Sequence, residues 1–170
     1  MSSSKLDIIV YGATGFTGQL VAEYLAARYS DGSLKWAMAG RSKDKLASVR
    51  DAIGAPADTP LIVADAADPA SLKAMVDQTK SVISTVGPYQ FYGNELLAVC
   101  VASGTDYFDL CGEPLWMREM IDKHEAAAKA RTIYQALVAN GLTLRHRPKP
   151  KRSDYDRRIG FFLDSLRPRP

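Results

Sequence analysis

Three glycines, each three residues after the last, follow an apolar run close to the start of the chain. The run spans residues 6–11, and the glycines are Gly12, Gly15 and Gly18. Apolar residues then recur at helical spacing from residue 20 to 25, so the segment predicts a strand, a tight turn and a helix in succession. A dinucleotide-binding loop requires this succession of elements.

The spacing of the glycines predicts a separate role for each in such a loop. We expect Gly12 to allow a sharp exit from the strand, Gly15 to let a pyrophosphate approach the backbone, and Gly18 to let the helix pack tightly on the sheet. The unpaired amides at the start of the helix would face the anion. The alternative is an ordinary glycine turn without a ligand. The predicted cofactor loop comprises Gly12, Ala13, Thr14, Gly15, Phe16, Thr17 and Gly18.

Strands and helices are predicted to alternate through the first 130 residues. Further strands are predicted at residues 34–39, 61–64, 81–86 and 105–110. Helices are predicted at residues 43–53, 69–76, 94–103 and 115–130. Near-continuous apolar strands that alternate with helices indicate a parallel sheet covered on both faces. We therefore predict an α/β domain over residues 1–130, a Rossmann-type doubly wound parallel sheet with strand order 3-2-1-4-5.

The net charge of +3 conceals two parts of opposite sign. Residues 1–144 carry 13 Lys and Arg against 16 Asp and Glu, whereas residues 145–170 carry nine against three. The basic character therefore belongs to the end of the chain, which argues against nucleic-acid binding by the folded part. We expect residues 131–170 to be a divergent, basic and disordered tail, without a sixth strand.

Other features of composition exclude several classes of protein. No apolar run approaches the roughly 18–20 residues needed to span a bilayer, and we expect no signal peptide before the first strand. The two cysteines, Cys100 and Cys111, give no disulfide framework, and neither they nor the isolated histidines form a metal site. We expect a cytoplasmic protein, with peripheral membrane association left open.

The end of the second predicted strand favours NADP over NAD. An acidic residue there would accept hydrogen bonds from the ribose 2′-hydroxyl of NAD, but the chain has Arg41 followed by Ser42. A guanidinium can bind a 2′-phosphate, and Ser42 can cap the next helix. The alternative for Arg41 is a surface salt bridge. Asp65, just past the third strand, either meets the adenine edge or is an ordinary loop carboxylate.

Two later strand ends also carry candidate site residues. Gly87 and Pro88 follow the fourth strand, on the sheet edge where ligands bind in such folds. The aromatic residues after them, Tyr89 among them, either line the site or merely cover the end of the sheet. After the fifth strand, Cys111 is either a reactive thiol or, as we favour, a buried and inert cysteine, because no cation lies next to it in the sequence.

Four motifs in order resemble the N-terminal NADP domain of saccharopine dehydrogenase-like oxidoreductases, a group that includes the bacterial trans-acting enoyl reductases. The motifs are Tyr11-Gly-Ala-Thr-Gly-Phe-Thr-Gly18, Ala39-Gly-Arg-Ser42, Thr85-Val-Gly-Pro-Tyr89 and Tyr107-Phe-Asp-Leu-Cys-Gly-Glu-Pro114. The resemblance covers residues 5–130. It implies a nicotinamide cofactor and the reduction of a small molecule that is lipid-like or otherwise uncharacterised.

The resemblance also implies roles for individual residues. The loop from Gly12 to Gly18 would hold pyrophosphate, Arg41 the adenosine phosphate, and the segment Gly87-Pro88-Tyr89 would line the nicotinamide side. It implies no catalytic acid or base, and no oligomeric state.

The resemblance ends near residue 130, and the substrate domain of the family has no counterpart in residues 131–170. We expect an out-of-frame tail and a cofactor domain with little turnover of its own. The alternative is a non-enzymatic NADP-binding module whose basic tail contacts a partner or an acidic lipid. A short-chain dehydrogenase is disfavoured, because none of the tyrosines is followed by lysine at the fourth position, as the proton-transferring pair of that class requires.

Overall fold

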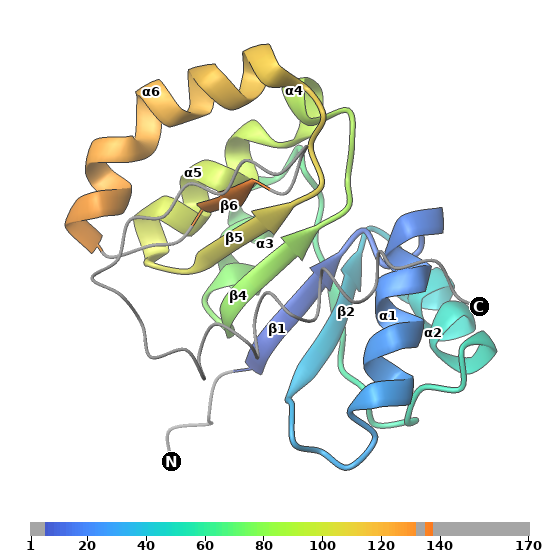
Figure 1. Ribbon diagram of the computed structural model, residues 1–170. Coiled ribbons are helices and arrows are strands. Elements are labelled where there is room, and N and C mark those ends of the chain that lie inside the picture. The colour runs from blue at the N-terminus through green and yellow to red at the C-terminus, as the bar shows by residue number, and fades with distance from the viewer. Residues whose placement is uncertain (1–5, 132–134, 138–170) are drawn as a thin grey trace, which may run out of the picture.

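The computed structural model describes residues 6–131 and 135–137, and within them the strands form one parallel sheet (Figure 1). The order is β3-β2-β1-β4-β5-β6, so the predicted order of the first five strands is confirmed. The strands are β1 (Leu6–Tyr11), β2 (Trp36–Gly40), β3 (Leu61–Val63), β4 (Thr79–Ser84), β5 (Asp106–Asp109) and β6 (Gln135–Leu137).

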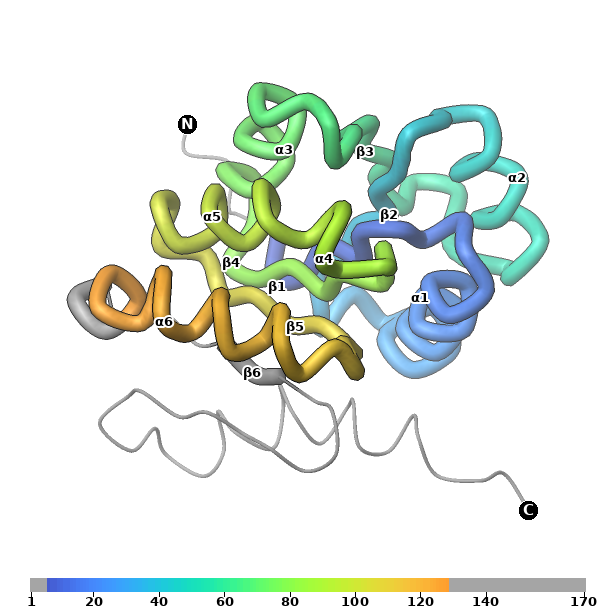
Figure 2. Tube along the Cα trace, turned by 90° about the horizontal axis from the view of Figure 1, so that it is seen from above, coloured from blue at the N-terminus to red at the C-terminus, as the bar shows by residue number. Residues whose placement is uncertain are grey.

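Helices cover both faces of the sheet and give the domain three layers. The helices are α1 (Phe16–Arg28), α2 (Lys43–Ala52), α3 (Pro69–Val76), α4 (Tyr89–Tyr92), α5 (Asn94–Ser103) and α6 (Pro114–Arg131). Figure 2 shows α1 and α2 on one side of the sheet and α3, α5 and α6 on the other. No helix in the described ranges is long and apolar enough to cross a membrane.

The central strand β1 shows why the sequence folds into layers. Successive side chains of a strand point to opposite faces. Ile8 and Val10 accordingly pack with α1 and α2, whereas Ile9 and Tyr11 pack with α3, α5 and α6. The strand can satisfy two cores only because every residue from position 8 to 11 is apolar or aromatic.

Local capping fixes the helix boundaries at the predicted residues. The Ser42 hydroxyl accepts a hydrogen bond from the amide of Lys45 at 3.4 Å and starts α2. The Asp68 carboxylate accepts one from the amide of Ala70 at 3.0 Å and starts α3. Gly104, with φ of 72°, ends α5 in the left-handed conformation that favours glycine.

The structure departs from the sequence prediction at the edge of the sheet. Strand β6 pairs in parallel with β5, with Tyr107 opposite Gln135, so the expectation that the chain lacks a sixth strand is wrong. An added strand satisfies the backbone groups that β5 would otherwise leave unpaired at the sheet edge. The sheet thus continues past residue 130. The expectations of a disordered or out-of-frame tail concern residues 131–170, and of these residues 132–134 and 138–170 lie outside the described part of the chain.

Candidate functional site

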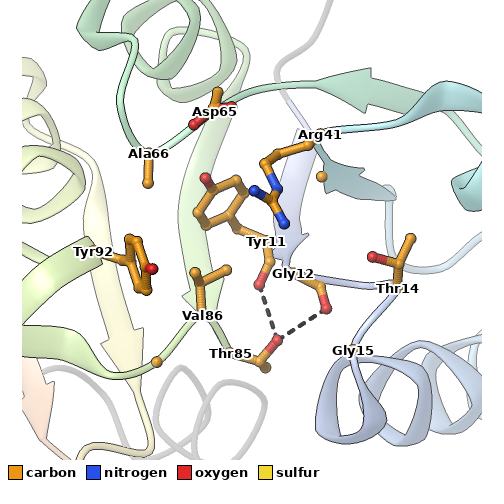
Figure 3. A pocket seen from close by; sticks show the side chains of 12 residues that line it. Tyr11, Gly12, Thr14, Gly15, Arg41, Asp65, Ala66, Thr85, Val86 and Tyr92 are labelled. Atoms are coloured by element: carbon orange, nitrogen blue, oxygen red, sulfur yellow. Dashed lines mark hydrogen bonds between the residues drawn. The ribbon is translucent and has the colours of Figure 1, made fainter.

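A cavity of about 280 Å³ lies at the carboxyl edge of the sheet, where β1, β2, β3 and β4 end (Figure 3). In open parallel sheets, ligands bind at this edge and at the point where the strand order reverses, here between β1 and β4. The lining residues are Tyr11, Gly12, Thr14, Gly15, Gly40, Arg41, Asp65, Ala66, Thr85, Val86, Gly87 and Tyr92.

The glycine loop between β1 and α1 forms the floor of the cavity. Each of its three glycines is suited to its place for a different physical reason. Gly12 has φ of +87°, and a Cβ there would lie 2.7 Å from the Thr85 hydroxyl. A Cβ on Gly18 would lie 2.1 Å from the Gly12 carbonyl oxygen. Gly18 therefore packs against the turn itself, whereas the sequence suggested that it packs against the sheet. A Cβ on Gly15 would meet only the Gly12 carbonyl oxygen, at 3.4 Å. The backbone at Gly15 is therefore open to a ligand.

Helix α1 begins beside this loop without a side-chain cap. Its cap residue is Gly15, which has no side chain to accept from the amides of the first turn. The first amides of a helix have no partner within the helix, and together with the helix dipole they favour an anion. This end of α1 therefore has the chemistry of a phosphate site.

Thr85 connects the glycine loop to β4, and the sequence analysis did not single it out. Its hydroxyl donates to the carbonyl oxygens of Tyr11 at 3.0 Å and Gly12 at 3.2 Å (Figure 3). Its amide donates to the same Tyr11 oxygen at 2.9 Å. These bonds hold the ends of the two strands together at the reversal point. The signal that could have found Thr85 is its place at the carboxyl end of a predicted strand.

Arg41 extends over the cavity from the end of β2 (Figure 3). Within the part of the chain that the structure describes, its guanidinium forms no hydrogen bond or ion pair, so the salt-bridge alternative finds no partner there. An unpaired guanidinium beside a cavity is suited to a phosphate.

Tyr11 is a lining residue that the sequence analysis placed only in a strand. Burial raises the pKa of Tyr11 to about 12, the negative charge of Asp65 acts in the same direction, and the positive charge of Arg41 opposes it. The Tyr11 hydroxyl therefore stays neutral and can donate a hydrogen bond at physiological pH.

Asp65 acts as a loop carboxylate, one of the two roles that the sequence left open, and it also reaches the cavity. One carboxylate oxygen accepts a hydrogen bond from the amide of Ala67 at 2.9 Å, which fixes the turn after β3. The Ser71 hydroxyl accepts from the Asp65 amide at 3.0 Å and anchors the same turn. Asp65 also lines the cavity, on the same side as Arg41 and near the Tyr11 ring (Figure 3).

Of the predicted cofactor residues, the structure brings Gly12, Thr14, Gly15, Arg41, Asp65 and Gly87 to the cavity. The others lie around it without lining it: Ala13, Phe16, Thr17, Gly18, Ser42, Pro88 and Tyr89. Ala13 is fully buried, the side chain of Phe16 is 82% exposed, and Ser42 serves as a helix cap.

The structure corrects the prediction that the Tyr89 side chain lines the site. Its side chain is buried, and its hydroxyl donates to the Ser84 carbonyl oxygen at 3.0 Å and accepts from the Leu110 amide at 3.4 Å. It covers the sheet end, the alternative that the sequence left open. The short helix α4 turns Tyr89 inward, and the aromatic residue of this segment that lines the cavity is Tyr92.

The cysteines and histidine outside the cavity show no sign of reactivity. Burial, together with the negative charges of Asp109 and Glu113, raises the pKa of the Cys111 thiol to about 11, although the hydrogen bond from the Glu113 amide opposes this; the raised pKa agrees with the inert role. Cys100 is fully buried, and burial raises its pKa. His124 is half-buried on α6, and its pKa is lowered by burial and by Lys123. No cluster of potential metal ligands occurs among the described residues.

The cavity lining includes residues that the sequence analysis did not assign to the site. They are Tyr11, Gly40, Ala66, Thr85 and Val86. All five lie at or just beyond the carboxyl end of a strand, so their position in the sequence could have predicted that they line the cavity. Tyr92 also lines the cavity, and it was one of the aromatic residues for which the sequence left open whether they line the site. The orientation of Tyr92 depends on α4, which the sequence did not predict.

The chain matches the family of the saccharopine dehydrogenase NADP binding domain over residues 8–134 and belongs to that family. The resemblance seen in the sequence and the prediction of NADP as the cofactor are thereby confirmed.

Curated relatives include a trans-acting enoyl reductase of Mycobacterium leprae, 49% identical over 127 residues, which covers 74% of this chain and 30% of the relative. A trans-acting enoyl reductase of Mycobacterium bovis is 47% identical over 139 residues, with 81% and 32% covered. The chain thus spans about a third of the length of these relatives.

Solved structures share the fold at low sequence identity. The apo saccharopine dehydrogenase (L-Glu forming) of Saccharomyces cerevisiae aligns with a TM-score of 0.59 and 17% identity over 76% of this chain and 26% of that one. The triphenylmethane reductase of a Citrobacter species, solved with NADP(H), aligns with a TM-score of 0.55 and 18% identity over 80% and 50%. These likenesses support the Rossmann-type fold.

Proposed function

We propose that this member of the saccharopine dehydrogenase NADP binding domain family holds NADP in the cavity at the ends of β1 to β4, as the cofactor domain of an oxidoreductase. The observation that carries the proposal is the guanidinium of Arg41, which has no hydrogen-bond or ion-pair partner among the described residues. It faces the cavity from the side opposite the glycine loop. One anion site at the loop and a second at Arg41 match the pyrophosphate and the 2′-phosphate of one NADP molecule.

The proposed roles of the remaining cavity residues follow from this orientation of NADP. The pyrophosphate would lie over the loop from Gly12 to Gly18, and the adenosine would extend toward Asp65. The nicotinamide would then lie on the opposite side of the reversal point, beside Gly87 and toward β5. Ser42 would contribute as the cap that holds the start of α2 next to Arg41.

For the reaction, we propose the reduction of an enoyl double bond in a small, lipid-like molecule. The names of the two mycobacterial relatives support this reaction class. Bound NADPH supplies hydride, while the residues of this domain bind and orient the cofactor. The exposed side chains of Phe91 and Leu115, 71% and 88% exposed, follow β4 and β5 at the same sheet edge and offer apolar contact to such a substrate.

The alternative, a non-enzymatic NADP-binding module with a basic tail that contacts a partner or an acidic lipid, depends on residues beyond 137. Those residues lie outside the described part of the chain, and nothing among the described residues favours this alternative over a cofactor domain.

Reversal of the charge at Arg41 tests the proposed orientation. Arg41→Asp should weaken NADPH binding by about 1.5–3 kcal/mol, or roughly 10- to 100-fold, because a charged hydrogen bond is lost and a repulsion is added. NADH lacks the 2′-phosphate and should lose far less. Titration of both cofactors by fluorescence measures the two losses.

The matched control is Lys43→Asp, which makes the same change in net charge at an exposed residue of α2 outside the cavity lining. It should leave both affinities unchanged. Equal losses of NADPH and NADH in the Arg41 variant would contradict the assignment of Arg41 to the 2′-phosphate.

A further inference from the structure

The start of α4 is held by a carboxylate from a different part of the chain. The Glu113 side chain, in the loop between β5 and α6, accepts a hydrogen bond from the Tyr89 amide at 2.7 Å and another from the Gln90 amide at 2.9 Å. Each carboxylate oxygen takes one amide. Charge-assisted bonds of this kind are roughly twice as strong as bonds between neutral groups.

A second set of contacts fastens the same turn to the start of α6. The Tyr89 ring lies 5.6 Å from the Trp116 ring, and the Trp116 indole donates to the Asn94 side-chain oxygen at 2.7 Å. Gly93 leaves room for this packing, since a Cβ there would lie 2.6 Å from the Trp116 ring. The turn from Tyr89 to Gly93 is therefore tied to the start of α6 by polar and apolar contacts together.

Two residues that line the cavity adjoin or belong to the fastened turn. Gly87 precedes it and Tyr92 lies within it. Glu113 itself does not line the cavity. Its effect on a ligand must therefore pass through the position of the segment 87–92, which forms the wall on the β5 side of the strand reversal.

We propose that Glu113 is a positioning residue that sets the wall beside the nicotinamide half of NADP and leaves the adenosine half unaffected. The inference rests on the proposed function for the orientation of the cofactor. The adenosine half would contact Arg41 and Asp65, whose strand ends are held by the Ser42 and Ser71 hydroxyls rather than by Glu113. The two halves of the site are thus positioned by separate contacts.

The test compares whole NADPH with adenosine 2′,5′-bisphosphate, which carries the 2′-phosphate but has no nicotinamide. Binding of each to the unaltered chain, to Glu113→Ala and to Glu113→Gln is measured by calorimetry. Glu113→Ala should weaken NADPH binding about 10-fold and change the binding of the bisphosphate by less than about twofold. Glu113→Gln keeps one acceptor of the two and should give a smaller loss of NADPH affinity.

The emission of bound NADPH gives a second readout, because it reports the surroundings of the nicotinamide; it should shift in the Glu113 variants. Glu95→Gln removes an exposed carboxylate from the first turn of α5 and serves as the control without effect on either ligand. If Glu113→Ala does not fold by circular dichroism, the glutamine variant, which keeps the side-chain volume, decides.

Equal losses of both ligands in the folded glutamine variant would show a general structural role and overturn the inference. Unchanged NADPH binding would overturn it as well. If the unaltered chain binds NADPH but not the bisphosphate, the proposed orientation of the cofactor fails, and the inference fails with it.

Discussion

The three glycines of the loop occupy equivalent places in a motif but answer to different physical demands. Gly12 is required by its positive φ and by its contact with Thr85, and Gly18 by its contact with the turn, both within the protein itself. A Cβ on Gly15 would fit, since its backbone is extended and its nearest neighbour would lie at 3.4 Å. Of the three, Gly15 is therefore the one that packing within the described protein does not require, as we expect if a pyrophosphate approaches its backbone.

Substitution separates these demands. Gly15→Val should leave the protein folded, yet abolish the binding of both NADPH and NADH, because the branched side chain fills the space that the pyrophosphate needs. Gly18→Ala should destabilise the fold severely, because its Cβ would lie 2.1 Å from the Gly12 carbonyl oxygen. Circular dichroism during heating and fluorescence titration measure the two effects. Retained cofactor binding by Gly15→Val would show that the loop does not hold phosphate.

Because of the buried carboxyl group of Asp109, at the end of β5, we expect the stability of the protein to depend on pH. Its side chain is 0% exposed, and burial raises its pKa from 3.8 to about 6, although the Cys111 amide and the Tyr107 hydroxyl act to lower it. The folded protein thus binds this proton more tightly than the unfolded chain does. The contribution to stability is present below about pH 4 and is lost as the pH rises through about 6. Two pKa units correspond to roughly 3 kcal/mol.

Asp109→Asn removes this titration while keeping an acceptor for the Cys111 amide. We expect the free energy of unfolding of the variant, relative to that of the unaltered protein, to rise between pH 4 and pH 7. Urea denaturation of both proteins across this range measures the difference, and other carboxylates cancel in the comparison. A difference that stays constant with pH would contradict the assignment of the titration to Asp109.

At the scale of elements, the local sequence pattern predicted those strands and helix ends that interactions between neighbouring residues determine. The apolar residues from 8 to 11 predicted a strand buried on both faces, and Ser42 predicted the start of the helix after β2. Helix α4 was missed because the Glu113 carboxylate, more than 20 residues away in the sequence, satisfies its first amides. Strand β6 was missed because its three residues gain their partner from the edge of β5.

The candidate site was predictable to the same extent. Gly12, Arg41, Asp65 and Gly87 reach the cavity because parallel strands place their carboxyl ends along one edge. The aromatic residues after β4 were not separable in the sequence, since only the helical turn of α4 sends Tyr89 into the core and Tyr92 to the cavity.

At the scale of the whole molecule, the cavity joins the two halves of the sheet. Its lining comes from the ends of β1, β2 and β3 on one side and of β4 on the other, and the segments beyond these ends lead to helices on both faces. A cofactor that contacts all of them binds only when both halves are folded and aligned. Such a ligand stabilises the domain in proportion to its affinity for the folded state.

We therefore expect NADPH at 100 times its dissociation constant to raise the free energy of unfolding by about 2.7 kcal/mol. For a domain of this size, the midpoint of thermal unfolding should rise by roughly 5–10 °C. At the same concentration NADH should give a much smaller shift, and Arg41→Asp should reduce the NADPH shift to the NADH level, because the difference depends on one phosphate contact. Thermal unfolding followed by circular dichroism measures all three shifts. An equal rise with NADPH and NADH in the unaltered protein would mean that the cavity does not distinguish the 2′-phosphate, and that Arg41 remains unpaired for another reason.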